Sequence, residues 1–519
     1  MSLATTFSSF NLEKYSRWLW AAVLFTLPVT SFRYFPFLGD STQVRPLALY
    51  PLAILILILI VRLWRKEISN PFPGSLILLG AFLLTALLAS ALGSLNAPLE
   101  LRGASYFDRV IRAWFTVGIG LLFFVAAIWM NRDENDVRFS VKWLLLGLCL
   151  HIVWSLVQAV SFYTPLISRE TMRDLQTSFS MRVPMKNRRF SGMAFESSWL
   201  AGQIATLYMP WLVAALLTRY RVFKQKWVEP LLFLAALTLL FLTFSRGGIL
   251  YFLAAGLVTA WVGRGDFFTR LRDWLASPFR SELVTPSRTR DIALRLALIS
   301  VLIVALAGAG YSMVNNNYFS KLFSGIEKAD SLEEYVIYNY AGGRAAYVWS
   351  AMGAYSLEPW TGVGLGASGL YMYDYLPDFS KTSLFEIARQ LDPSSRAIPN
   401  PKSMYVRVLA ETGLLGMTLF LAFLFSMLAD MRLLMRSGGK RFFALAGIFA
   451  WIAVFLYNAT QDSFATPNIW INFGILAGLS AGVMDGESPL TPASTTPSGS
   501  AHYRPDDPRE REGQGQEAS

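Results

Sequence analysis

The chain has 519 residues, of which 54% are hydrophobic and only 16% are charged. This composition, with a mean hydropathy of +0.41, is typical of a membrane protein and excludes an ordinary soluble domain. The formal net charge of +11 is explained by basic loops that face anionic lipid headgroups, so it does not require a nucleic-acid partner.

Apolar runs recur along almost the whole chain. A run of about 20 apolar residues can cross a hydrocarbon core of about 30 Å, so these runs predict about twelve transmembrane helices. They lie near residues 17–33, 46–64, 75–94, 111–130, 141–162, 194–217, 228–243, 247–262, 292–313, 405–429, 442–460 and 467–484. We therefore expect an all-α, polytopic transmembrane helix bundle.

The orientation is predicted from the positions of Lys and Arg. Basic loops at 62–67, 219–226, 264–274 and 431–441 fall on the same side of a twelve-span path, which predicts that this side and both termini are cytoplasmic. Spans one to nine then occupy 1–313, and a large, partly helical extracytoplasmic loop occupies 314–404. Spans ten to twelve occupy 405–485, and residues 486–519 form a cytoplasmic tail whose Pro, Ser, Gly and charge content predicts disorder.

Arginines also occur at the predicted outer ends of the helices. In the stretch FLTFSRGGILYF, Arg246 stands at a predicted break between two helices, where Gly247 and Gly248 permit a tight turn. Arg344 lies in the large outer loop. The segment before the sixth span adds four more cations: Arg182, Lys186, Arg188 and Arg189. Guanidinium groups bind phosphate oxygens by paired hydrogen bonds, so an outward-facing anion site is one interpretation, and snorkelling interfacial arginines are the other.

The large outer loop is too long to lack structure, because unstructured connections rarely exceed about 15 residues. Its aromatic side chains are either stacking faces for sugar rings or an interfacial aromatic belt, and the sequence leaves both interpretations open. These side chains are Tyr335, Tyr338, Tyr340, Tyr347, Trp349, Trp360, Tyr371, Tyr373 and Tyr375.

Four sequence blocks occur in order along the chain. Three are RFSGMAFESSWLA at 189–201, FSRGG at 244–248 and YVRVLAETGLLG at 405–416. The fourth is the pattern Gly343, Arg344, Trp349, Pro359, Gly362, Gly364 and Gly366. Together these blocks resemble the O-antigen ligase and polymerase superfamily. The resemblance implies a multi-span glycosyltransferase of the GT-C type on the outer face of the bacterial cytoplasmic (inner) membrane. Such enzymes take a glycan from undecaprenyl pyrophosphate and need no metal and no other cofactor. Ligases give the glycan to the lipid A core of lipopolysaccharide, whereas polymerases give it to another lipid-linked repeat.

The resemblance also implies which residues form the site. Arg246 and Arg344 match the arginine positions of the family best, followed by Arg189, and we expect them to bind the pyrophosphate. Arg188 and Lys402 are further candidates for this contact. The glycines of the loop pattern are expected to shape the backbone where it approaches the substrate: Gly343, Gly362, Gly364 and Gly366.

The chain departs from the family at one position. Family ligases carry His-Asn where the large loop enters the next helix, and alignment on Tyr405, Glu411 and Gly413 puts Lys402 and Ser403 there. A general base is still useful, and Glu196 is the first candidate and Glu411 the second. The missing histidine favours a polymerase, in capsule, exopolysaccharide or O-antigen assembly, over a ligase.

There are three alternative interpretations. A transporter or flippase of lipid-linked glycans would show repeated halves and functional ionisable groups near the span centres, whereas here the predicted span centres are almost free of charge and the sequence has no visible internal repeat. A non-catalytic assembly subunit is left open by the missing histidine. A metal-dependent GT-C enzyme would need paired acidic residues in the first outer loop, which offers only Asp40, so no metal site is predicted.

Overall fold

The protein is almost entirely helical in the part that the structure describes. The computed structural model describes residues 11–35, 42–68, 72–98, 100–182, 189–264, 341–392 and 394–487, with isolated positions between 269 and 337. In these ranges the one sheet is a hairpin of two short antiparallel strands, β1 (Glu100–Leu101) and β2 (Ala104–Ser105). The predicted all-α class is therefore confirmed.

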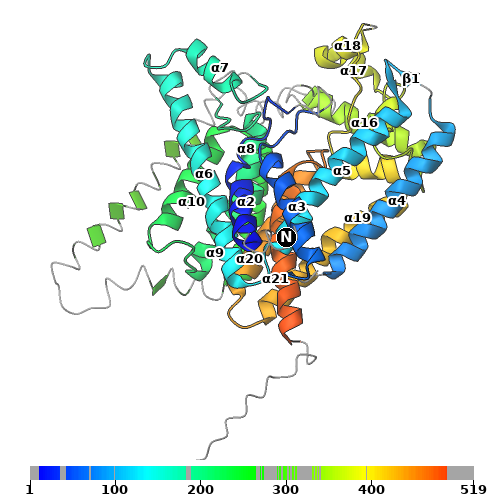
Figure 1. Cartoon of the computed structure of the whole chain (residues 1–519). Helices are drawn as coiled ribbons and strands as arrows, with labels where there is room; N and C mark the ends of the chain where they lie inside the picture. Colours follow the sequence, from blue (N-terminus) through cyan, green and yellow to red (C-terminus); the bar gives the residue numbers. More distant parts are fainter. Residues whose placement is uncertain are drawn as a thin grey trace, which may run out of the picture.

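The helices follow the apolar runs of the sequence (Figure 1). The first half of the chain forms α2 (Leu12–Thr26), α3 (Leu49–Trp64), α4 (Gly74–Asn96), α5 (Tyr106–Trp129), α6 (Glu134–Tyr163) and α7 (Arg169–Thr177). Next come α8 (Ser197–Gln203), η4 (Ile204–Tyr208), α9 (Met209–Thr218), α10 (Val228–Leu242) and α11 (Arg246–Val262). The remainder forms α16 (Gly342–Leu357), η6 (Ser368–Leu370), α17 (Asp378–Ser383), α18 (Phe385–Leu391), α19 (Met404–Arg436), α20 (Arg441–Asn458), η7 (Pro467–Ile469) and α21 (Ile471–Glu487).

Among the described residues, seven helices are long and apolar enough to span a membrane. They are Gly74–Asn96, Tyr106–Trp129, Glu134–Tyr163, Ser197–Thr218, Met404–Arg436, Arg441–Asn458 and Pro467–Met484. Three shorter apolar helices, α3, α10 and α11, coincide with further predicted spans. Half of the positions of the ninth predicted span (292–313) lie outside the described residues, and the predicted tail from residue 488 lies outside them entirely. The total of twelve spans and the sidedness of the loops stay predictions.

The break predicted at SRGG is confirmed. Helix α10 ends at Leu242 and α11 begins at Arg246. Between them Phe244 has φ +49°, a left-handed conformation that no continuous helix contains. The Ser245 side chain then caps α11 by accepting a hydrogen bond from the Gly248 amide.

The helices pack around one extended hydrophobic core. Helix α19 packs against α4 and α20, α20 also packs against α9 and α11, and α21 packs against α5. Large aromatic side chains fill the contacts between them, and Trp211 and Trp470 are almost completely buried. Because these contacts join early and late helices, they set the positions of the chain segments that meet at the ends of the bundle.

Helix α19 is broken at Gly413, which has φ +64° and ψ −167°. The segment 359–366, which follows α16, lies beside this break and forms main-chain hydrogen bonds with the residues of α19 around it. The Val363 amide donates to the Ala410 carbonyl at 3.0 Å, and the Leu414 amide donates to the Pro359 carbonyl at 2.9 Å. The large loop is therefore fixed to the tenth predicted span by main-chain hydrogen bonds.

Candidate active site

A cavity of about 760 Å³ opens at one end of the bundle. Its walls come from five separate segments: 42–44, 109–116, 182–199, 343–407 and 457–466. In Figure 1, α16, α17 and α18 lie at the same end as α7 and the start of α8. All five segments lie in loops that the sequence predicts on the outer side, or at the helix ends next to them.

The cavity carries an excess of positive charge. Among the residues that the structure describes, six cationic side chains line it, against three carboxylates, and the rest of this lining is mostly neutral and polar. The cations are Arg109, Arg112, Arg182, Arg344, Lys402 and Arg407, and the carboxylates are Glu196, Glu386 and Asp462. Cations in a concave site attract anionic ligands, because low-dielectric walls focus their field.

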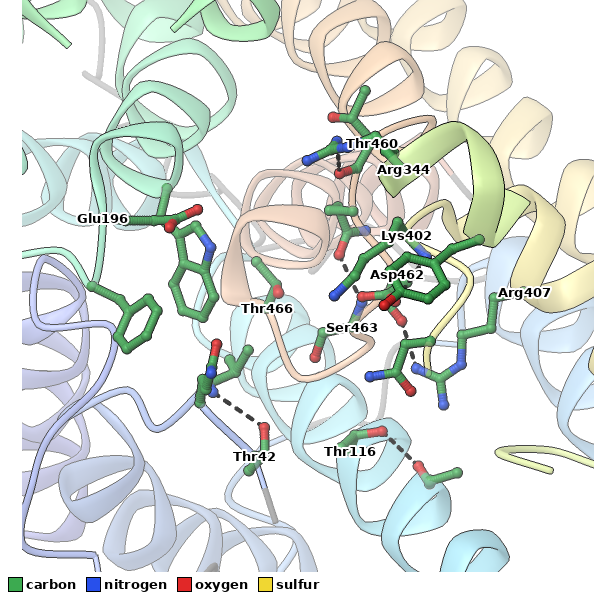
Figure 2. Close-up of a pocket in the computed structure, with 18 of the residues that line it drawn as sticks. Thr42, Thr116, Glu196, Arg344, Lys402, Arg407, Thr460, Asp462, Ser463 and Thr466 are labelled. Carbon is green, nitrogen blue, oxygen red and sulfur yellow. Dashed lines mark hydrogen bonds between the residues drawn. The ribbon is translucent and has the colours of Figure 1, made fainter. Parts of the chain in front are cut away.

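One wall presents Glu196. This residue is the N-cap of α8, and its backbone is extended there (φ −151°, ψ 167°). One carboxylate oxygen forms an ion pair with Arg182 at 2.5 Å, and the other accepts a hydrogen bond from the Ser198 hydroxyl. Figure 2 shows Glu196 on one side of the cavity, with Arg344, Lys402 and Arg407 on the other. The carboxylate thus lies across the cavity from the main group of cations.

The opposite wall holds Arg344 in the first turn of α16. Its Nη1 donates to the Thr460 carbonyl at 2.5 Å, in the loop that follows α20. The Thr460 hydroxyl in turn forms a hydrogen bond with the Tyr251 hydroxyl of α11. Three segments that are far apart in sequence therefore set the position of one guanidinium group.

Lys402 lies beside Arg344 on this wall (Figure 2). Its amide donates to Asp462 Oδ2 at 3.0 Å, and its Nζ lies 5.8 Å from the centre of the Tyr347 ring. Burial and the charge of Glu386 raise the pKa of Tyr347, so its hydroxyl stays protonated and donates to Gln390 Oε1. A cationic side chain therefore faces the cavity where the family pattern has histidine.

Arg407 is held by a buried ion pair. Its Nε donates to Glu411 Oε2 at 3.0 Å, and its Nη1 donates to the Asp462 carbonyl at 2.5 Å. The other oxygen of Glu411 accepts the Ser368 hydroxyl at 2.8 Å. The side chains of Arg407 and Glu411 are only 13% and 2% exposed. Glu411 is thus buried behind Arg407, and Arg407 reaches the cavity wall.

The structure brings together only part of the predicted site. Glu196, Arg344, Lys402, Gly343 and Gly366 line the cavity. Arg246, Arg189, Glu411, Gly362 and Gly364 are described but do not line it. Arg188 lies outside the described residues. The predicted cluster therefore divides into a cavity wall and a group of residues around it.

Comparison with known proteins finds one family match. A family model described as O-antigen ligase matches residues 231–421, which run from α10 into α19. This match supports the resemblance of the chain to the O-antigen ligase/polymerase superfamily. Its members are membrane glycosyltransferase-like enzymes of surface polysaccharide assembly, with lipid-linked glycans as substrates. None of the curated proteins compared matches the chain. The segment of this chain that matches the family model contains Arg246, Arg344, Lys402, Arg407 and Glu411. Glu196 lies before that segment.

The glycines of the superfamily pattern serve the packing of the segment 359–366. Gly362, Gly364 and Gly366 have φ values of +72°, +101° and +85°, which residues with a side chain rarely adopt. A Cβ at Gly362 would lie 2.4 Å from the Glu411 carbonyl carbon, and one at Gly364 only 1.9 Å from the Tyr106 hydroxyl. The close approach is therefore to the protein's own helices, and the approach to substrate stays a prediction.

Five of the charged cavity residues were not predicted from the sequence: Arg109, Arg112, Glu386, Arg407 and Asp462. Arg109 and Arg112 stand three residues apart in FDRVIRAW, at the mouth of a predicted span, and this spacing puts them on one helix face. Arg407 stands inside the block YVRVLAETGLLG, four residues before Glu411. Nothing in the sequence near Asp462 marks it, since its place depends on how the loop after α20 folds.

Metal binding was also considered. No group of three or more His, Cys, Asp or Glu side chains that could hold a metal ion occurs within the described ranges. Independence of metal ions stays a prediction.

Proposed function

We propose that this protein transfers a glycan from undecaprenyl pyrophosphate to an acceptor hydroxyl in the cavity, at the outer face of the bacterial inner membrane. The observation that carries the proposal is the cavity itself, which places a carboxylate across from several cations in a chain that resembles a superfamily acting on lipid-linked glycans. A diphosphate leaving group develops negative charge as the glycosidic bond breaks, and fixed cations stabilise that charge.

Arg344, Lys402 and Arg407 are assigned to the donor diphosphate. The two arginines are oriented before any ligand binds: Arg344 by the Thr460 carbonyl, and Arg407 by Glu411 on the same helix and by the Asp462 carbonyl. Groups held in place in this way stabilise a transition state without a further cost of reorganisation. Lys402 acts as a point charge, whereas the two guanidinium groups can grip phosphate oxygens in pairs.

Glu196 is assigned as the general base. The acceptor hydroxyl attacks the anomeric carbon, its proton passes to the Glu196 carboxylate, and the bonding pair of the C1–O bond leaves with the diphosphate. Arg182 and Ser198 hold the carboxylate in place at the cavity wall, where it can accept the proton. Metal ions have no part in this scheme.

Arg189 and Arg246 enter the proposal indirectly. Arg189 Nε donates to the Thr243 carbonyl at 2.9 Å, in the turn between α10 and α11. Arg246 begins α11, and α11 carries Tyr251, which contacts the loop that orients Arg344. We assign this pair to fixing the turn and, through α11, the position of Arg344.

The acceptor is proposed to be another lipid-linked repeat, which makes the enzyme a polymerase. This assignment depends on Lys402, which occupies the position where family ligases carry histidine. Deleting the gene in its host and separating the surface glycans on a gel tests it. Single repeats that remain attached, with long chains lost, are the result expected for a polymerase. Long chains that accumulate on undecaprenyl pyrophosphate would instead identify a ligase.

Purified protein with a lipid-linked repeat unit tests the site. Arg344→Gln removes the charge and should lower kcat/KM by about 100-fold or more, as loss of an oxyanion-stabilising group does. Arg173→Gln removes an exposed arginine of α7 that does not line the cavity, and serves as the matched control. Wild-type activity in Arg344→Gln would refute the assignment.

A further inference from the structure

The donor diphosphate does not account for all the cations of the cavity. Of the six, Arg182 and Arg407 are each paired with a carboxylate. No carboxylate of the described residues lies within ion-pair distance of the other four: Arg109, Arg112, Arg344 and Lys402. Cations gathered in a concave site repel one another unless an anion joins them, so this imbalance favours an anionic ligand.

The four cations are positioned by two different parts of the structure. Arg344 and Lys402 contact the loop after α20, through Thr460 and Asp462. Arg109 and Arg112 stand on α5. Arg109 is held instead by the large outer loop, since its Nε donates to the Gly366 carbonyl at 3.2 Å and its Nη2 to Asn400 Oδ1 at 3.1 Å.

One face of α5 is turned toward the cavity. Arg109, Arg112, Ala113 and Thr116 all line it, and their spacing of three, four and seven residues is that of a single helix face. Both hydrogen-bond acceptors of Arg109 are neutral oxygens, and the carboxylates of Glu411 and Asp462 attract its charge without forming an ion pair with it. Arg112 is exposed, one turn further along α5, and can move to meet a ligand.

The α5 pair also lies outside the segment that matches the family, which begins at residue 231. The donor cations Arg344, Lys402 and Arg407 all lie inside it. Arg109 and Arg112 therefore lie in the part of the chain that the O-antigen ligase match does not cover. This position is consistent with a role in recognising a particular acceptor.

We propose that Arg109 and Arg112 form a second oxyanion subsite, which binds an anionic group carried by the acceptor. This inference rests on the proposed function, because it takes Arg344, Lys402 and Arg407 as the donor subsite. The anionic group is either the diphosphate of a second lipid-linked glycan or the carboxylate of an acidic sugar. Both present oxygens that a guanidinium fork binds with charge-assisted hydrogen bonds.

Binding measurements on the full chain test the proposal. The protein is placed in phosphatidylcholine nanodiscs, which add no anionic lipid, and titrated calorimetrically with undecaprenyl pyrophosphate. It is then titrated with trigalacturonate, an acidic oligosaccharide, while undecaprenyl pyrophosphate is saturating. Arg112→Gln is compared with the wild type, and Arg173→Gln is again the control.

Two results support the subsite and identify its ligand. If two molecules of undecaprenyl pyrophosphate bind per chain, and Arg112→Gln weakens the second at least about tenfold, the subsite binds a second diphosphate. If one molecule binds, and trigalacturonate binds beside it in the wild type at least about tenfold more tightly than in Arg112→Gln, the subsite binds a sugar carboxylate.

Two other results overturn it. One is a wild type that binds a single undecaprenyl pyrophosphate and no trigalacturonate. The other is an Arg112→Gln variant that binds both probes as the wild type does. Arg344→Gln separates this failure from that of the proposed function, because it should weaken the first diphosphate alone. If Arg344→Gln binds the first diphosphate normally, the donor assignment is wrong whatever Arg112 does.

Discussion

Replacing Glu411 with leucine should destabilise the protein and lower its transferase activity together. The carboxylate is 2% exposed and accepts hydrogen bonds from Arg407 and Ser368. Its loss leaves the Arg407 guanidinium, itself 13% exposed, without its anionic partner. Removing one partner of a buried ion pair typically costs about 3–5 kcal/mol, because an uncompensated charge stays buried. We expect a cost in this range for Glu411→Leu.

A double-mutant cycle separates the pair from its surroundings. Arg407→Leu should cost a similar amount, but the double variant should cost clearly less than the two single costs together, because an apolar pair leaves no buried charge. The free energies are measured by equilibrium unfolding in mixed micelles with increasing SDS. Two results would refute the claim that Arg407 and Glu411 form a buried ion pair. One is a loss of unfolding free energy below about 1 kcal/mol in each single variant, and the other is strict additivity of the two losses in the double variant.

Glu411→Gln distinguishes positioning from catalysis. The amide keeps an acceptor for Arg407 Nε, so a positioning role predicts a fall of about tenfold or less in kcat, with most of the stability retained. A general base at this position would lose about 100- to 10,000-fold in kcat when it is replaced by an amide. Burial behind Arg407 favours the smaller effect, and the larger one would return Glu411 to the catalytic role predicted from the sequence.

Two further predictions concern stability alone. Gly364→Ala places a Cβ 1.9 Å from the Tyr106 hydroxyl at φ +101°, and should cost about 1–3 kcal/mol by the same unfolding assay. Gly343→Ala should cost far less, because its Cβ would lie 3.8 Å from the Glu386 carboxylate, and equal costs would contradict the packing described. Glu229→Ala removes the buried acceptor of the Val222 and Phe223 amides and should cost about 1–3 kcal/mol, and a neutral result would argue against that contact.

The helices could be predicted from sequence, because membrane crossing imposes a length and an apolar composition on each of them. The break before Arg246 could also be predicted, but its residues could not: the turn is made at Phe244 and Ser245, whereas Gly247 and Gly248 lie in the first turn of α11. The membership of the cavity wall could not be predicted in the same way. In the sequence, Arg109 and Arg407 look like ordinary charged residues at helix ends. Only the packing of α5 and α19 in the bundle brings both side chains to one cavity.

The sequence analysis grouped Arg246 with Arg344 because both match family positions. The structure separates them, with Arg246 at the start of α11 and Arg344 on the wall. It also gives the glycine pattern a physical cause. Gly362 and Gly364 must fit against Glu411 and Tyr106, and no local pattern shows where a loop will meet helices that are distant in sequence.

The walls of the cavity span the chain from residue 42 to residue 466, and this has a consequence for biosynthesis. The Tyr106 hydroxyl contacts the carbonyl of Val363, 257 residues later, and Arg102 contacts the carbonyl of Ser395, 293 residues later. The ribosome therefore makes α4 and α5 long before it makes the residues that contact the end of this helix pair, such as Val363 and Ser395. A nascent chain that has not yet reached residue 466 lacks part of the wall, so the ribosome completes nearly the whole protein before any copy can begin to act on a lipid-linked glycan.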